Sequence, residues 1–279
     1  MIPTERTFYI FKNLNNQSIY LVKEKFQPEP SQSKLNNNNK TLTEKRLTNI
    51  SKLQIEFYKI IGFLCSETRY GNVFKKEEDV YYVENLFIEY MKNPIYYQYL
   101  LKFKELGKYI YYHIVDVFTL STLFCRKEGI PNIEDIAIGF LFHDIGKLYT
   151  PVHLLRKEGN LTKKEYHVLQ KQLKKGYDLL KQIGLEKVIY LANSQHEHIT
   201  GSGYREELED EELPKEVQIL KIIDRYSVIT LRRSYEEVVT VSDAIDTLYN
   251  ESHLYNKELL NSFTDFIGIY PENAVVSLK

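Results

Sequence analysis

The chain has 279 residues, and its 37 Lys and Arg residues almost balance its 38 Asp and Glu residues, which excludes a protein that holds duplex nucleic acid by bulk attraction to phosphates. With 43% hydrophobic residues, it can bury one large core or two modest ones. Two cysteines exclude a disulfide framework, and with neither a signal peptide nor an apolar run of about 20 residues that could span a membrane, we expect a cytoplasmic protein.

The N-terminal 42 residues are expected to hold a small β structure followed by a linker. Short β-prone runs flank a polar turn at residues 15–18, a pattern that predicts a hairpin or a small sheet. Residues 27–42 are rich in Pro, Ser and Asn and cannot bury a core face. We therefore predict a linker there and a boundary near residue 42.

The rest of the chain has helical spacing. From Thr43 onward, apolar residues recur at intervals of three and four, beginning with Leu53, Phe57, Ile60, Ile61 and Leu64. Further along, Thr162 and Glu165 form a capping box, and Pro214 opens another helix. The sequence therefore predicts a mainly α fold.

A histidine and an aspartate end the apolar helix that follows Asn132. His143 and Asp144 are adjacent, and neighbouring positions on a helix point about 100° apart. At a helix end, two such side chains can hold one ion from two directions. Imidazole with carboxylate suits Mn, Fe, Zn or Ni.

Two more residues of these types lie on apolar helix faces. His113 shares its face with Val117, Leu120 and Phe124, and Asp224 shares one with Val217, Leu220 and Val228. Each has an ordinary alternative: a core histidine bonded to backbone, or an aspartate paired with Lys or Arg. Because a buried charge needs a partner, and because all four residues point inward from successive helices, we favour a metal site.

Three runs resemble the HD-GYP branch of the HD superfamily of metal-dependent phosphohydrolases, whose members hydrolyse cyclic di-GMP in bacterial signalling. They are HDIGKLYTPVHLLRKEGNLTKKE at 143–165, QHEHITGSGY at 195–204 and DRYSVITLRRSY at 224–235. The resemblance begins near residue 93. It implies an HD-domain helical bundle at 101–279 as the catalytic domain, with residues 43–100 as a helical regulatory or dimerisation region.

The resemblance also implies an activity and roles for single residues. The activity is hydrolysis of cyclic di-GMP by hydroxide that a divalent metal, Mn or Fe, activates for attack on phosphorus. Asp144 and Lys147 are then catalytic, and one ion is held by His113, His143, Asp144 and Asp224. The residues expected to contact substrate are Lys147, Arg233, Gly203 and Tyr204.

The chain departs from the family pattern at several positions. Gln172, Gln195 and His196 stand where three histidines would hold a second ion, so we expect one firmly bound metal. Tyr109 replaces a glutamate that some members place one turn before the first histidine, and this replacement argues against a third metal ion. Arg205 replaces the proline after Gly-Tyr, which weakens the expectation that this loop contacts diguanylate cyclase domains.

Two other functions stay open at this point. The chain could be a one-metal phosphohydrolase that acts on another nucleotide or a small phosphoester. It could also be a domain that binds a cyclic dinucleotide or a partner protein without cutting it. The paired glutamines favour the binder, and the intact first metal set favours an enzyme. A homodimer is compatible with either function.

Overall fold

The predicted N-terminal hairpin is present. β1 (Arg6–Lys12) pairs antiparallel with β2 (Ser18–Glu24), so that Arg6 lies opposite Glu24. The structure is a computed structural model that describes residues 6–12, 18–24, 37–65, 68–155, 157, 162–194, 213–231 and 239–268. The connecting residues 13–17, including most of the predicted turn, lie outside this set.

The first long helix begins earlier than the sequence suggests. α1 (Asn37–Cys65) starts inside the segment 27–42, for which the Asn and Ser content predicts a linker. Asn costs a helix only a fraction of a kcal/mol per residue, which is too little to end a helix of 29 residues. The chain divides into two compact units, Met1–Glu67 and Thr68–Lys279, whereas the boundaries expected from the sequence lie near residues 42 and 100.

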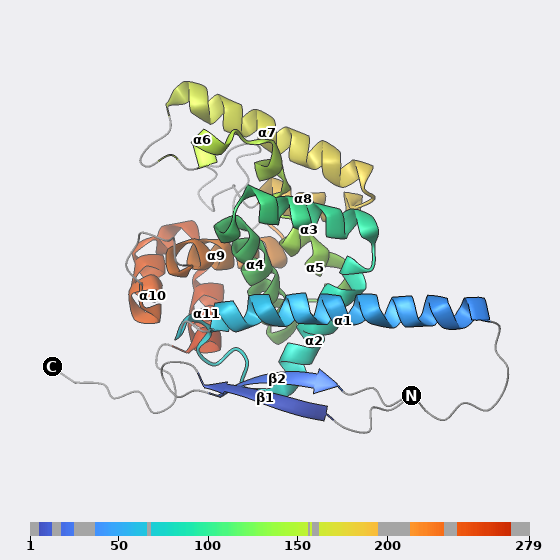
Figure 1. Ribbon diagram of the computed structural model, residues 1–279. Coiled ribbons are helices and arrows are strands. Elements are labelled where there is room, and N and C mark those ends of the chain that lie inside the picture. Colours follow the sequence, from blue (N-terminus) through green and yellow to red (C-terminus); the bar gives the residue numbers. More distant parts are fainter. Residues whose placement is uncertain are drawn as a thin grey trace. The chain divides into compact units, whose positions relative to one another are not determined.

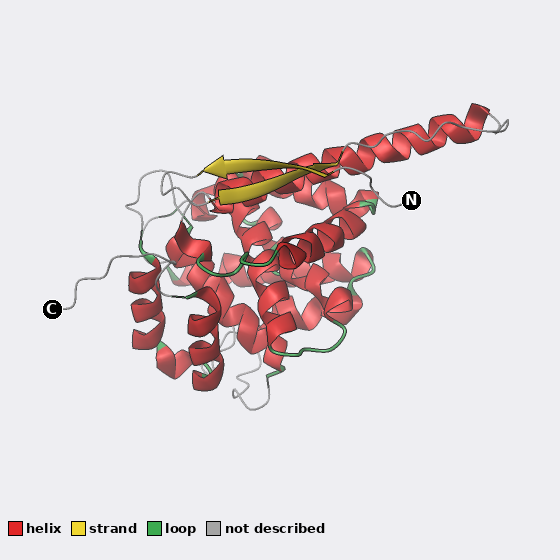
Figure 2. Cartoon of the chain, turned by 90° about the horizontal axis from the view of Figure 1, so that it is seen from below, coloured by secondary structure: helices red, strands yellow, loops and turns green. Residues whose placement is uncertain are grey.

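Among the described residues, the second unit is built of helices, and the two strands, yellow in Figure 2, belong to the first. Its main helices are α2 (Glu77–Met91), α3 (Pro94–Leu106), α4 (Lys108–Lys127), α5 (Ile133–Leu141), α7 (Lys163–Gln182), α8 (Ile189–Ser194), α9 (Lys215–Thr230), α10 (Val241–Asn250) and α11 (Lys257–Ile267). The predicted mainly α fold is confirmed. None of the helices in the described part of the chain is long and apolar enough to cross a bilayer.

α4 is the central helix of the second unit and packs against α3, α5 and α9 (Figure 1). Every residue from His113 to Cys125 is buried, as expected for a helix that is covered on all sides. Most of these residues are apolar, but His113, Asp116 and Ser121 are polar and almost fully buried. The centre of the core therefore contains groups that need polar partners.

A close contact between two glycines fixes α7 against the turn that follows α5. That turn contains the short helix η2 (Ile145–Tyr149). A Cβ atom at Gly176 of α7 would come within 2.8 Å of the backbone of Gly146, so only glycine allows this approach. The N-terminus of α7 carries the predicted capping box between Thr162 and Glu165, and Lys157 forms an ion pair with Glu165.

Candidate metal centre

Four of the predicted site residues lie together. His113 comes from α4, His143 and Asp144 from the turn after α5, and Asp224 from α9, and one ligand atom from each lies within 4.8 Å of all the others. The side chains of the first three are at most 3% exposed, whereas that of Asp224 is 33% exposed. The cluster is therefore enclosed by the core and opens to the outside next to Asp224.

Backbone hydrogen bonds fix the turn that carries His143 and Asp144. α5 ends at Leu141. The amide of Ile145 donates to the carbonyl oxygen of Phe142 at 3.0 Å, and the amide of Lys147 donates to the carbonyl oxygen of Asp144 at 2.8 Å. The apolar residues of α5 anchor this turn in the core, so its two polar side chains are carried inward with it.

The ring of His143 is held in one orientation. Its Nδ1 lies 2.7 Å from the carbonyl oxygen of Phe140, and because a carbonyl only accepts hydrogen bonds, Nδ1 carries the hydrogen. Nε2 then faces two carboxylates, at 3.3 Å from Oδ2 of Asp144 and 3.3 Å from Oδ1 of Asp224. This is how a metal-binding histidine is usually oriented by its second nitrogen.

The ring of His113, from α4, completes the cluster. Its Nδ1 lies 2.9 Å from Oγ of Ser227. Its Nε2 lies 3.1 Å from Oδ1 of Asp224 and 3.4 Å from Oδ2 of Asp144. This Nε2 is buried and makes no hydrogen bond within the described part of the chain. Two imidazole nitrogens and two carboxylate oxygens thus converge, a donor set that fits a divalent transition metal.

The electrostatics of the cluster match such a site. Burial lowers the pKa of His143, but the carboxylates of Asp144 and Asp224 outweigh it and raise this pKa to about 9. Burial raises the pKa of Asp144, but Lys147 and His143 hold it well below its usual range. The pKa of Asp224 is likewise lowered, against the effect of burial, by the rings of His113 and His143. Both aspartates are therefore charged at neutral pH and attract a cation.

Lys147 and Tyr109 lie beside the four residues. The ammonium of Lys147 pairs with Oδ2 of Asp144, and the Lys147 side chain is 31% exposed. Burial lowers its pKa, but Asp144 and Asp224 outweigh this and raise it, so the ammonium stays charged. The ring of Tyr109 stacks on that of His113, with an interplanar angle of 1° and centroids 6.1 Å apart.

Apart from Lys147, the residues predicted for a second ion and for substrate have no side chain that the structure describes. Gln172 belongs to α7, but its side chain is outside the described set. The others lie outside the described residues altogether: Gln195, His196, Gly203, Tyr204, Arg205 and Arg233. Their roles remain predictions.

Two residues that were not predicted from the sequence, Asp116 and Ser227, lie just behind His113. Asp116 is fully buried and contacts Ser227, Arg69 and Tyr70. A signal was present, because Asp116 interrupts the apolar run that follows His113. It could not identify the partners, which come from the distant segments η1 (Thr68–Tyr70) and α9.

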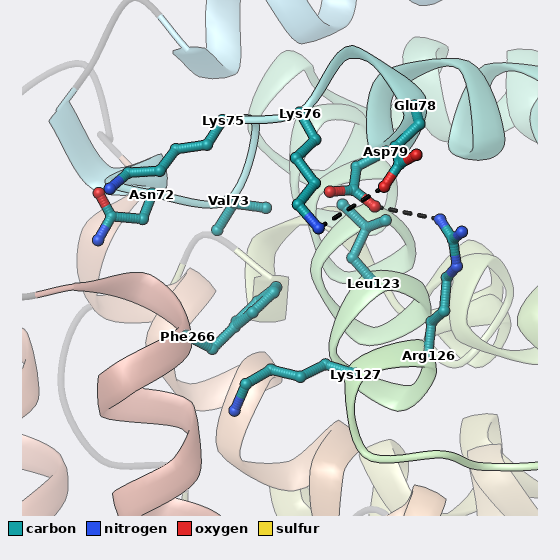
Figure 3. A pocket seen from close by; sticks show the side chains of 10 residues that line it. All are labelled: Asn72, Val73, Lys75, Lys76, Glu78, Asp79, Leu123, Arg126, Lys127 and Phe266. Carbon is teal, nitrogen blue, oxygen red and sulfur yellow. Dashed lines mark hydrogen bonds and ion pairs between the residues drawn. The ribbon is translucent and has the colours of Figure 1, made fainter.

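A separate pocket of about 430 Å³ lies at the other end of α4 (Figure 3). Arg126 and Phe266 line it, and Arg126 pairs with Asp79 at 3.1 Å. α4 rises about 1.5 Å per residue, so Arg126 lies about 20 Å from His113 along the helix axis. This pocket is therefore distinct from the candidate metal site.

Comparison with known proteins identifies the domain that contains the cluster. A family model described as "HD domain" matches residues 108–259, more than half of the chain. The matched segment contains all four clustered residues.

Several curated proteins are similar to the chain. A cyclic di-GMP phosphodiesterase of Pseudomonas aeruginosa is 28% identical over 185 residues, which cover 64% of this chain and 44% of that protein. A cyclic di-GMP phosphodiesterase response regulator of Xanthomonas campestris is 33% identical over 125 residues, which cover 42% of this chain and 32% of that protein. A 3'3'-cGAMP-specific phosphodiesterase of Vibrio cholerae is 31% identical over 149 residues, which cover 52% of this chain and 34% of that protein. The chain therefore spans less than half the length of each of these relatives.

Proposed function

The chain belongs to the HD-domain family, and on that basis we propose that it is a metal-dependent phosphodiesterase that hydrolyses cyclic di-GMP. One observation carries the proposal: the convergence of His113, His143, Asp144 and Asp224 on one point at the edge of the core. The names of the similar proteins support the substrate class, since each is a phosphodiesterase that acts on a cyclic dinucleotide.

The proposed ligands are the Nε2 atoms of the two histidines and one oxygen of each aspartate. A divalent metal bound there, with Mn or Fe our expectation, supplies Lewis acidity that polarises a phosphate oxygen and activates water for attack on phosphorus. The protein's part is to hold these four donors in place. Both histidine rings are anchored through Nδ1, to Phe140 and to Ser227, so their Nε2 atoms are already directed at the site.

Lys147 is the proposed contact to the phosphate. Its ammonium pairs with Asp144, which is also a proposed metal ligand. Because its side chain reaches the exposed side of the cluster, Lys147 can meet a phosphate oxygen while it stays next to Asp144. A positive charge at this position stabilises negative charge that develops on the phosphate during the reaction.

The exposure of the cluster indicates the side from which substrate approaches. Asp224 and Lys147 are about one third exposed, whereas His113, His143 and Asp144 are almost fully buried. The phosphodiester therefore reaches the site next to Asp224 and Lys147. The buried side excludes water from the back of the two histidines, which strengthens the electrostatic interactions inside.

The experiment is to incubate the purified chain with Mn²⁺ and cyclic di-GMP, 3'3'-cGAMP or bis(p-nitrophenyl) phosphate, and to separate the products by chromatography. We expect cyclic di-GMP to yield the linear dinucleotide or GMP. Turnover of 3'3'-cGAMP alone would change the assigned substrate. Turnover of the small phosphodiester alone would favour a one-metal phosphohydrolase of other specificity. Binding of a cyclic dinucleotide without products would favour a binding domain.

A matched pair of variants distinguishes an effect on the metal site from a general effect of losing an aspartate. Asp144→Ala removes a proposed ligand and should abolish both Mn²⁺ binding and turnover. Asp265→Ala removes an exposed aspartate from α11 and should change neither. Turnover by a metal-free Asp144→Ala protein would rule out the proposed mechanism.

A further inference from the structure

The buried carboxylate of Asp116 lies behind the candidate metal site and is not one of its four proposed ligands. Asp116 is 0% exposed and accepts hydrogen bonds from three residues, which come from η1 and α9. Arg69 of η1 forms an ion pair with Oδ2, the hydroxyl of Tyr70 donates to Oδ1 at 2.7 Å, and Oγ of Ser227 lies 2.5 Å from Oδ2. An arginine and two hydroxyl donors around one carboxyl group indicate that Asp116 is ionised.

The charge of Asp116 fixes the direction of the hydrogen bonds that follow. An ionised carboxylate can only accept, so the hydroxyl hydrogen of Ser227 points at Asp116. The oxygen of Ser227 is then left to accept from Nδ1 of His113, 2.9 Å away. His113 therefore carries a hydrogen on Nδ1, and Nε2 is the ring nitrogen directed at Asp144 and Asp224, where a metal ion can take the place of a proton.

Ser227 alone could not enforce this arrangement. A serine hydroxyl both donates and accepts, and it rotates to suit its neighbours. Without a fixed acceptor behind it, Ser227 could donate to Nδ1 of His113, which would place the ring hydrogen on Nε2. A hydrogen there would point into the site and prevent that nitrogen from binding a metal.

We propose that Asp116 and Ser227 are positioning residues, which act as a relay that holds His113 in the one tautomer able to bind the metal. The proposal rests on the metal site of the proposed function. Arg69 balances the charge of Asp116, and its backbone carbonyl accepts from the hydroxyl of Tyr226 at 2.5 Å, which ties η1 to α9. The relay is therefore built into the packing of η1, α4 and α9.

The first test compares two buried serine-to-alanine changes in the full chain. Ser227→Ala removes the acceptor for Nδ1 of His113, whereas Ser121→Ala makes the same change at a fully buried position of a different helix, α4. We expect Ser227→Ala to weaken Mn²⁺ binding 10- to 100-fold in calorimetric titrations, as is common when the outer partner of a metal-binding histidine is lost. Ser121→Ala should bind within about twofold of the wild type. Equal affinities in all three proteins would overturn the relay.

The second test reads the tautomer directly and needs no metal. In metal-free protein with ¹⁵N-labelled histidine, long-range proton–nitrogen NMR spectra should show His113 with its hydrogen on Nδ1. Ser227→Ala should shift the ring toward the Nε2-hydrogen form, and Ser227→Thr, which keeps the hydroxyl, should restore the original form. An unchanged tautomer in Ser227→Ala overturns the proposal. If that variant does not fold, Ser227→Cys, with its weaker acceptor, decides by the same readout.

A double-mutant cycle tests whether Asp116 acts through Ser227. Asp116→Asn removes the charge that orients the hydroxyl and should weaken Mn²⁺ binding in the wild-type background. In the Ser227→Ala background it should cost no further affinity, because the relay is already broken. Additive losses would overturn the relay. If the wild-type chain binds no Mn²⁺, the proposed function fails, and the tautomer measurement still decides the relay by itself.

Discussion

The Nε2 atom of His143 lies 3.3 Å from Oδ1 of Asp224, across the gap between the turn after α5 and α9. Because Nδ1 of His143 donates to the carbonyl of Phe140, Nε2 is the atom that takes either a proton or a metal ion. The carboxylates of Asp144 and Asp224 favour protonation as well as metal binding, so a proton and a metal ion compete for this nitrogen.

The first prediction concerns metal affinity and pH. Burial lowers the pKa of His143, but the two carboxylates raise it to about 9, so metal binding at neutral pH must release a proton. The affinity for Mn²⁺ should therefore rise by up to about tenfold per pH unit between pH 7 and pH 9 and then level off. Calorimetry in buffers of different ionisation enthalpy counts the released protons. An affinity that does not change over this range would contradict the prediction.

The second prediction concerns the stability of the metal-free protein. The raised pKa of His143 stabilises the fold below about pH 6.5, and this contribution is lost as the pH rises toward 9. The lowered pKa values of Asp144 and Asp224 stabilise it above about pH 4, and that contribution is lost in acid. The free energy of unfolding in a chelator should thus fall by about 3 kcal/mol between pH 6.5 and pH 9. Urea denaturation measures it, and His143→Asn should remove the decline.

The third prediction concerns the contact between Gly176 and Gly146. In Gly176→Ala the new Cβ would lie 2.8 Å from backbone atoms of Gly146, which cannot move aside as a side chain could. We expect a loss of about 1 to 3 kcal/mol in the free energy of unfolding, measured in urea. Gly62→Ala is the control, because its Cβ meets nothing within 4 Å and alanine favours a helix. Equal stability of the two variants would show that α7 adjusts freely.

The four clustered residues could be predicted from the sequence because each breaks an apolar helix face or ends an apolar helix. His113 and Asp224 share their faces with core residues such as Val117 and Leu220, which are fully buried. Periodicity alone therefore indicated that these side chains point inward. Their order along the chain, together with the adjacent pair His143 and Asp144, indicated that the four side chains form one metal site.

The relay could not be predicted in the same way. Asp116 lies on a helix that is buried on all sides, so no exposed face sets its position apart. Its partner Arg69 comes from a three-residue helix that carries no periodic signal. Pattern reasoning identifies which side chains turn inward, whereas contacts between distant segments depend on how the helices pack.

The fourth prediction separates the two roles of Lys147. If it contacts phosphate, Lys147→Gln should lower turnover by about 10²- to 10³-fold, as when one group that stabilises charge in the transition state is removed. The affinity for Mn²⁺ should stay the same or rise, because the ammonium no longer competes for Asp144. Lys164→Gln, at an exposed position of α7, should change neither quantity. Parallel losses of turnover and Mn²⁺ affinity would mean that Lys147 only holds Asp144 in place.

The last prediction concerns the number of ions. Gln172 and Gln195 stand where the family resemblance places histidines of a second metal, and only His196 is retained. An amide oxygen suits hard cations such as Ca²⁺ better than transition metals. Elemental analysis of the purified chain should therefore find about one transition metal per chain. Replacing both glutamines with histidine should raise this number toward two, and a native chain that already holds two ions tightly would show that the glutamines are no barrier.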